Sequence, residues 1–156
     1  TYPVFTAIAA PEVQNKLNGD FAIIAGPYLQ NLATGGCELD YTLTFVSEKF
    51  ISMVFFGVLD EGEKEIFAKI PLNIDVQTGA QLALGDVLNL RDADLLPVLR
   101  LLTKKDKVDF SKGIPESWYY NGTNFVFCQR SETGEWLEAT VSASDLKKFL
   151  LKPELV

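Results

Sequence analysis

The hydrophobic pattern of the chain changes its period near Gly36, and this change constrains the fold more than any other feature. Before it, apolar residues in segment 11–32 recur every three or four positions, which places them on one face of a helix. They are Val13, Leu17, Phe21, Ile24, Tyr28 and Leu32. Gly26 and Pro27 predict a kink or break in this helix, and residues 34–36 predict its end. Beyond Gly36 apolar and polar residues alternate, as in strands.

Three strands are predicted at residues 38–46, 50–59 and 65–76. The first and third alternate between apolar and polar residues, whereas the second is almost continuously apolar. The second strand therefore needs cover on both faces and is predicted to be central. Pro71 has no backbone donor, so the third strand is expected at a sheet edge or a bulge.

The last third of the chain predicts a hairpin of residues 118–120 and 125–129, followed by a strand at 136–141. Together these segments favour an α+β fold, in which an antiparallel sheet carries helices packed on one face. No linker, repeat or low-complexity stretch divides residues 1–156, which are the length of one compact domain.

Two shorter helices are also predicted. One contains three leucines at helical spacing, Leu95, Leu99 and Leu102. Asp92 or Asp94 is placed to cap it. Ser142 and Asp145 have the spacing of a capping box for the other helix, which stops before Pro153.

Charge and hydropathy exclude two classes of partner. The chain carries 14 basic and 21 acidic residues, a net charge of −7, and the basic residues are scattered. Because nucleic acids and anionic membranes are bound through clustered Lys and Arg, neither is expected as a partner. The longest apolar run, within residues 50–59, is about half of what a bilayer-spanning helix needs, so no membrane insertion is expected. The absence of an initiator Met and of a leader predicts a trimmed or mature form.

The chain contains no histidine and only two cysteines, far apart in the sequence. This composition excludes Ser–His and Cys–His nucleophile pairs and every His-containing or Cys-rich zinc site. A Gly-rich phosphate loop is absent as well, so no metal or other cofactor is expected. An acidic run near the tip of the second hairpin lacks the spacing of a known calcium loop and is better explained as a solvated turn. This run is Asp60, Glu61, Glu63 and Glu65.

Catalysis by carboxylates alone remains an alternative. Four glutamates lie near aromatic residues in the last third: Glu116, Glu132, Glu135 and Glu138. A buried pair of carboxyl groups could act as acid and base on a carbohydrate. Acidic residues beside strands more often form the solvent-exposed face, so an enzyme is not the favoured interpretation. A deep pocket with two facing carboxyl groups would indicate an enzyme, and an aromatic patch or open sheet edge would indicate a binding module.

Aromatic residues supply the candidate binding site. In an extended strand Trp118 and Tyr120 share one face and Tyr119 takes the other. Packing in the core explains most such residues, but aromatic side chains also dominate interface hot spots. If Trp118 is in the core, Tyr119 is exposed, and we therefore select Tyr119 and Trp136 as the binding residues.

Cys37 and Cys128 allow two interpretations. A bond between them would join the first third of the chain to the last, across a long loop whose closure restricts the unfolded chain. Alternatively, each cysteine is a small apolar side chain that packs by itself. Two separate thiols are slightly favoured.

Several segments, in order, resemble a known family. They are Tyr2-Pro3 before the first helix, the stretch Asn73 to Gly79 followed by Leu82 to Leu88, the aromatic hairpin, and the ending Ala139 to Leu146. The order is similar to the extracytoplasmic domain of lysozyme-sensing bacterial anti-sigma factors and to the non-catalytic N-terminal region of peptidoglycan polysaccharide deacetylases. The most specific part is Asp-x-x-Thr-Gly at Asp75, followed by Leu-x-Asp-x-Leu at Leu84.

The resemblance implies a domain of unknown function outside the cytoplasm, secreted, periplasmic or membrane-anchored, and brings no catalytic residues. Residues 131–135 depart from the small-residue turn that precedes the last strand in better-known members, so lysozyme is not carried over as a partner. The expected function is a non-enzymatic binding or sensing module for a protein or a cell-wall glycan. An accessory domain of a larger cell-wall protein is a further alternative.

Overall fold

The computed structural model describes residues 3–6, 8, 10–31, 37–60 and 65–156. The predicted first helix is present as α1 (Pro11–Asn31), and its buried side chains repeat at the expected spacing. They are Val13, Leu17, Phe21 and Ala25. The predicted break at Gly26-Pro27 is wrong, because the helix continues through both residues. The carbonyl that Pro27 leaves unbonded belongs to Ile23, which lies on the exposed side of the helix where water can reach it.

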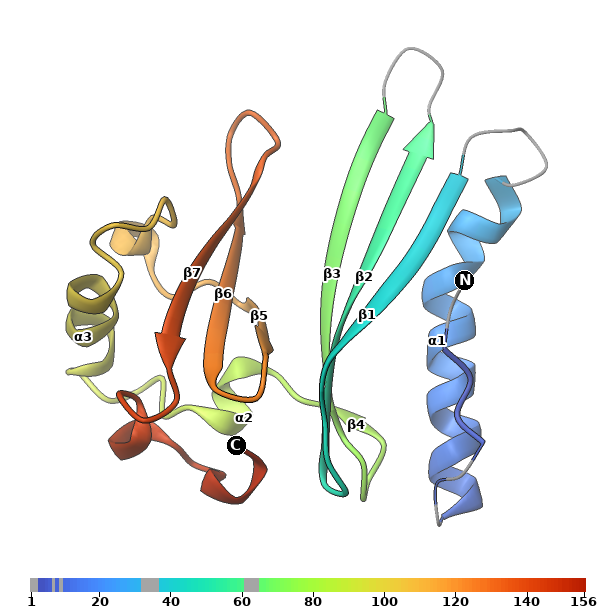
Figure 1. Ribbon diagram of the computed structural model, residues 1–156, viewed down its shortest axis with the longest axis horizontal. Coiled ribbons are helices and arrows are strands. Elements are labelled where there is room, and N and C mark those ends of the chain that lie inside the picture. Colours follow the sequence, from blue (N-terminus) through green and yellow to red (C-terminus); the bar gives the residue numbers. More distant parts are fainter. Residues whose placement is uncertain (1–2, 7, 9, 32–36, 61–64) are drawn as a thin grey trace.

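The next strands form an antiparallel sheet in the order β1-β2-β3-β4. They are β1 (Cys37–Val46), β2 (Phe50–Asp60), β3 (Glu65–Asp75) and the short β4 (Ala80–Gln81). The three strands predicted from the pattern are confirmed, and β2 is central as expected. Helix α1 lies across one face of this sheet (Figure 1).

Both faces of β2 are buried along its first half, which explains its continuous apolar sequence. Ile51, Met53 and Phe55 pack against α1 in one hydrophobic core. Phe50 points to the opposite face and belongs to a second, larger core with the C-terminal part of the chain. The sheet is thus an inner layer between α1 and the rest of the molecule (Figure 1).

The predicted hairpin and last strand are also confirmed, but they form a separate antiparallel sheet in the order β5-β6-β7. The strands are β5 (Ser117–Tyr120), β6 (Asn124–Arg130) and β7 (Trp136–Ser142). One face of this sheet supplies aromatic side chains to the larger core, among them Trp118, at 2% exposed, and Tyr120, at 3%. The described strands therefore make two antiparallel sheets in an α+β domain.

Two buried polar side chains join the sheets. Ser52 Oγ donates a hydrogen bond to Asn73 Oδ1 at 2.7 Å and accepts one from the Tyr120 backbone N–H at 2.9 Å. Asn73 Nδ2 donates to the backbone carbonyl of Trp118 at 2.7 Å. Side chains of β2 and β3 thus hydrogen-bond to the backbone groups at the outer edge of β5, where another strand would otherwise pair.

Helices α2 (Leu84–Val87) and α3 (Leu95–Leu102) contribute apolar side chains to the larger core, and the 3₁₀ turn η2 (Phe110–Lys112) lies beside α3. The predicted helix at α3 is confirmed, with Leu95 and Leu99 buried, but Leu102 is 43% exposed and does not join the core. Asp94 is at the N-cap position of α3 without a side-chain capping bond. None of the helices among the described residues is long and apolar enough to cross a membrane.

The predicted last helix is wrong. The chain after β7 forms turns and the short 3₁₀ helices η3 (Lys147–Phe149) and η4 (Pro153–Leu155). The Ser142 hydroxyl bonds to the hydroxyl of Ser144 at 2.6 Å, so the predicted capping box does not form. An isolated β-bridge between Leu88 and Leu150 holds this tail against the segment after α2. The apolar residues whose spacing predicted a helix pack one by one from the turns of this tail.

Candidate functional site

A cleft of about 580 Å³ lies between the two sheets, where β3 faces β7. Phe67 of β3 and Trp136 at the start of β7 both line it. Lys105, Asp106 and Lys107, which follow α3, line the same cleft. In Figure 1, β3 is the strand of its sheet that faces the β6–β7 hairpin. One of the two predicted binding residues, Trp136, therefore lines a cleft.

The backbone of β3 is open where it borders this cleft. Among the described residues β4 pairs only with Ile74 and Asp75, so the preceding part of β3 is an edge of the sheet. This confirms the edge position predicted from Pro71. Because Pro71 has no N–H, its position in the ladder with β2 is a non-hydrogen-bonded one, and positions two residues apart behave alike. Phe67 and Lys69 therefore direct their backbone N–H and C=O groups away from β2.

A charged cluster lies next to the cleft and connects the two sheets. Glu138 Oε1 on β7 accepts hydrogen bonds from Lys69 Nζ on β3 and, at 3.3 Å, from the Tyr119 hydroxyl on β5. The Lys69 side chain is 13% exposed, and its Nζ lies 5.6 Å from the ring centroid of Phe56 and 5.5 Å from that of Tyr119. The ion pair and the two cation–π contacts fix the distance between β3 and the second sheet at this level.

The structure brings Tyr119 and Trp136 to the same face of the second sheet. Register places Tyr119 opposite Val126 and Val126 opposite Thr140, and Trp136 is on the same side of β7 as Thr140. Tyr119 is half-buried, and burial, followed by the negative charge of Glu138, raises its pKa above the ordinary value. Tyr119 thus supports the cluster beside the cleft. Trp136 is partly buried, and its indole nitrogen has no hydrogen-bond partner among the described residues.

The four candidate glutamates are divided between different places. Glu116 lines a separate groove of about 590 Å³ between β3, α2 and β5, where no other carboxylate is among the described lining residues. Glu132 is 97% exposed at the β6–β7 turn, 4.0 Å from Lys112. Glu135 and Glu138 line the cleft, and the carboxylate of Glu138 is engaged by Lys69 and Tyr119.

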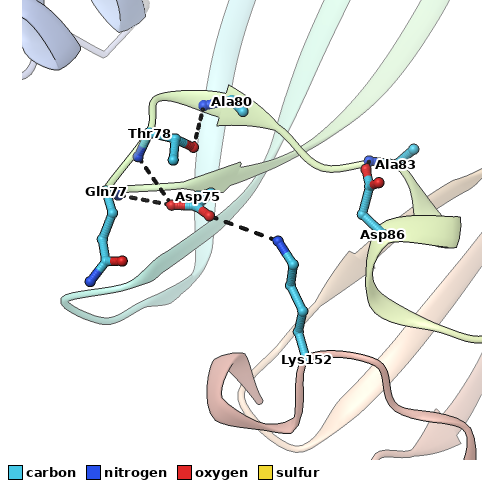
Figure 2. Close-up of polar contacts among 7 residues, drawn as sticks. All are labelled: Asp75, Gln77, Thr78, Ala80, Ala83, Asp86 and Lys152. Carbon is cyan, nitrogen blue, oxygen red and sulfur yellow. Dashed lines mark hydrogen bonds and ion pairs between the residues drawn. The ribbon is translucent and has the colours of Figure 1, made fainter.

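The motif that is most specific in the sequence, beginning at Asp75, is a turn (Figure 2). Asp75 Oδ1 accepts hydrogen bonds from the backbone N–H of Gln77 at 2.9 Å and of Thr78 at 3.2 Å. The Thr78 hydroxyl in turn accepts from the N–H of Ala80 at 3.2 Å. Gly79 has a φ of +65°, a left-handed conformation that glycine adopts without strain. These contacts reverse the chain from β3 into β4.

The second half of the motif is also structural. Asp86 Oδ2 accepts from the backbone N–H of Ala83 at 2.8 Å and fixes the first turn of α2. Lys152 Nζ lies 3.9 Å from Asp75 Oδ2, so the C-terminal tail contacts the turn (Figure 2). The carboxylates of Asp75 and Asp86 are therefore used to hold backbone.

Cys128 is a free thiol on β6, and its burial raises its pKa to about 12. The side chain of Cys37 lies outside the described residues, as does most of the acidic run at residues 60–65 that was considered for calcium. In the part of the chain that the structure describes, no group of three His, Cys, Asp or Glu side chains is arranged to hold a metal ion.

Sequence reasoning missed the other residues of the cleft. Phe67 offered a signal, because in the alternation of segment 65–76 it falls on the polar side, and it is 44% exposed. Lys105 and Lys107 offered none, since only the folded chain brings the segment after α3 to the start of β7.

Fold and cleft together define an α+β domain in which an open sheet edge borders a partly aromatic cleft. Solved structures with the same fold belong to the DUF3298 family, a domain family of unknown function. One is a DUF3298 family protein from Pseudomonas aeruginosa, with a TM-score of 0.61 and 14% identity, over 90% of this chain and 80% of that chain. Another, from Bacteroides fragilis, has a TM-score of 0.56 and 14% identity, over 90% of this chain and 66% of that one.

At this identity the likeness extends to the fold alone. No family model matches the sequence, and no curated protein matches it.

Proposed function

We propose that the chain is a non-enzymatic binding or sensing module that acts outside the cytoplasm, and that the cleft between the sheets is its recognition site. One observation carries the proposal: the exposed ring of Phe67 and the indole of Trp136 line a cleft at an open strand edge. Large aromatic side chains beside unpaired backbone groups are the components from which peptide-binding edges are built.

The location and the class of partner rest on the sequence resemblance to extracytoplasmic domains of anti-sigma factors and peptidoglycan deacetylases. Such domains operate at the cell envelope, where the available partners are proteins and cell-wall glycans. The fold shared with DUF3298 family proteins is compatible with this proposal and specifies no partner.

A carbohydrate-acting enzyme is the second candidate, because Asp106, Glu135 and Glu138 line one cleft. Two of these carboxylates already have partners within the protein. Asp106 Oδ2 accepts from the backbone N–H of Thr140 at 3.3 Å, and Glu138 is held by Lys69 and Tyr119. A general acid must keep a proton and deliver it to substrate, and carboxylates that accept from fixed donors are poorly placed for this role.

A combined binding and turnover assay tests the proposal. The purified chain is mixed with insoluble peptidoglycan or with exported proteins of the host, and both the bound fraction and the release of sugar or peptide ends are measured. We expect binding without turnover. Because an aromatic hot spot contributes about 2 kcal/mol or more, Trp136→Ala should weaken binding roughly thirty-fold. Leu151→Ala, at an exposed leucine outside the cleft, is the matched control and should bind normally.

If turnover is measured and is lost in a Glu138→Gln variant that remains folded, the interpretation as an enzyme replaces this proposal. Lysozyme is the first protein to test, and we expect no specific complex because residues 131–135 depart from the related domains. The chain has a net charge of −7 and will attract a basic protein at low salt, so only binding that persists at near-physiological salt is counted.

A further inference from the structure

We infer that the cleft takes a short stretch of an uncharged glycan chain, whose sugar rings lie against the aromatic side chains and whose hydroxyl groups bond to the charged side chains of the lining. The inference rests on the proposed function and deepens it, because it selects a glycan over a protein and states that the glycan is uncharged.

The charged side chains at the cleft balance one another. Lys105 and Lys107 line it. The described lining also contains three carboxylates, those of Asp106, Glu135 and Glu138. Lys69, which forms an ion pair with Glu138, brings the cations to the same number. An anionic or a cationic partner would therefore meet attraction and repulsion from the same lining, and the net charge of −7 on the whole chain adds repulsion for anions.

Several of these charged groups are free to bond a ligand. Lys105 and Lys107 are exposed, and within the described part of the chain neither ammonium group has a carboxylate partner. Glu135 lines the same cleft and is in no ion pair with a described residue. A hydroxyl group accepts a hydrogen bond from an ammonium group and donates one to a carboxylate. A glycan carries such hydroxyl groups on every sugar, so it can bond to both signs of charge at once.

Aromatic side chains supply the second argument. Phe67, at 44% exposed, and Trp136 line the cleft, and its volume of about 580 Å³ is typical of a pocket for a small molecule. The face of an aromatic ring carries partial negative charge and attracts weakly positive C–H groups. A pyranose with equatorial substituents has its C–H groups on a flat face and its hydroxyl groups around the rim. One sugar can therefore contact an aromatic ring and the charged side chains together.

An extended segment of a protein is the alternative occupant, because part of β3 is an open edge among the described strands. The backbone of such a segment would pair with β3, so its side chains would have to supply partners for both the ammonium groups and the carboxylates. Each sugar of an uncharged glycan supplies donors and acceptors without bringing a charge into the cleft. The lining therefore favours the glycan.

Isothermal titration calorimetry with defined tetrasaccharides at near-physiological salt tests the inference. The uncharged probes are cellotetraose and N-acetylchitotetraose, in which all ring substituents are equatorial. The deacetylated form of N-acetylchitotetraose is the cationic counterpart, and tetragalacturonate is the anionic one. A short peptide of alternating valine and serine represents the protein alternative.

We expect the better of the two uncharged probes to bind about five-fold more tightly than either charged tetrasaccharide, as exposed like-charge contacts allow. Phe67→Ala should weaken its binding about ten-fold, because one ring contact is lost, and Trp136→Ala should weaken it at least as much. Leu151→Ala, at an exposed leucine outside the cleft, should bind normally.

A second pair of variants separates hydrogen bonding from charge. Lys105→Gln with Glu135→Gln removes both charges but keeps polar groups that donate and accept, so binding of the uncharged probe should stay within about three-fold of the parent chain. Lys105→Ala with Glu135→Ala removes the bonding groups and should weaken binding about ten-fold. Lys49→Ala with Glu12→Ala makes the same change at two exposed residues outside the cleft and should have no effect.

No binding of either uncharged probe at millimolar concentrations, equal binding of charged and uncharged tetrasaccharides, or binding that Phe67→Ala leaves unchanged overturns the inference. Binding of the peptide without binding of the sugars also overturns it and selects a protein partner. The peptidoglycan and host-protein assay tests the proposed function separately. Trp136-dependent binding of a host protein there, with failure of the sugars here, would leave the proposed function standing without its glycan. Failure in both would remove both.

Discussion

Ser52 and Asn73 are polar side chains in an otherwise apolar interior, and their hydrogen bonds attach the second sheet to the first. Ser52→Ala leaves the Tyr120 N–H without its acceptor and the Asn73 Oδ1 without its donor. Because an unsatisfied buried polar group costs about 1–3 kcal/mol, we expect the free energy of unfolding to fall by about this amount. Urea unfolding of the purified chain measures it.

Ser144→Ala is the matched control, since the Ser144 hydroxyl bonds to that of Ser142 in an exposed turn. It should change stability by less than about 0.5 kcal/mol. Equal stability of Ser52→Ala and the parent chain would mean that the junction between the sheets depends on apolar packing alone.

Cys128 gives a prediction on pH. Its folded-state pKa is raised to about 12 from an ordinary value of 9.0, mainly by burial and further by the charge of Glu138. Between these values the unfolded chain has released the thiol proton and the folded chain has kept it. The stability contributed by the neutral thiol is therefore full below pH 9 and is lost as the pH rises from 9 towards 12.

In Cys128→Ala this part of the loss of stability at alkaline pH should be absent. The midpoints of urea unfolding of the two chains, compared across that pH range, measure it. Tyr119 and Tyr120 also have raised pKa values and remain in both chains, so the difference between the chains reports the thiol together with the part of the Tyr119 shift that the thiolate charge causes. An identical pH dependence in the two chains would contradict the assignment.

At the scale of single elements, two glycines should respond oppositely to alanine. Gly19 is inside α1, and apart from its chain neighbours and the helix's own backbone no atom of the described residues lies within 4 Å of the position of an added Cβ, so Gly19→Ala should stabilise the chain by about 0.5–1 kcal/mol. Gly79 has a φ of +65°, and an added Cβ would lie 3.1 Å from Val13 Cγ1. Gly79→Ala should therefore destabilise the chain by about 1–2 kcal/mol. Thermal unfolding compares them, and a shift of the same sign in both would contradict this account.

The turn after β3 gives a test that separates hydrogen bonding from charge. Asp75→Asn keeps a side-chain oxygen that can accept from Gln77 and Thr78, whereas Asp75→Ala removes it. We expect the alanine variant to lose about 1–2 kcal/mol of stability and the asparagine variant to lose much less, because the ion pair with Lys152 is long. Equal losses in urea unfolding would instead assign the role of Asp75 to its charge.

Elements with a strong period could be predicted from the sequence, since burial alone sets the pattern of α1, β2 and β3. The prediction of a last helix failed because Leu146, Phe149 and Leu150 have helical spacing but pack singly from turns. The break expected at Pro27 failed because the carbonyl that Pro27 leaves unbonded, that of Ile23, is on the exposed side of α1, where a lost hydrogen bond costs little. Rules that use only the neighbouring sequence do not include whether a residue faces solvent in the folded chain.

The division into two sheets is a property of the whole molecule, and nothing local specified it. Alternation shows that β5 has an inner and an outer face, but the Ser52 and Asn73 contacts that turn its edge onto β2 and β3 join residues far apart in the chain. The same applies to the site. Trp136 was selected by its chemistry, whereas its neighbours Phe67 and Lys105 are set beside it only by the docking of the sheets.

The arrangement of the sheets also explains why the cleft is where it is. The sheets are held together at β5 by the polar network, and again at Lys69 by its ion pair with Glu138. Beyond Lys69 the next cleft-facing residue of β3 is Phe67, which remains exposed. A partner can therefore reach the edge of β3 without separating the core.

Photocrosslinking in cells that produce the chain is the most direct test of the claim that this cleft is the recognition site. Benzoylphenylalanine is placed singly at Glu135 in the cleft, at Glu116 in the second groove, and at Lys147 on the exposed 3₁₀ turn η3. We expect a defined crosslinked product from position 135 and none from positions 116 and 147. A product from position 116 with none from position 135 would contradict the claim and move the site to the groove between β3, α2 and β5.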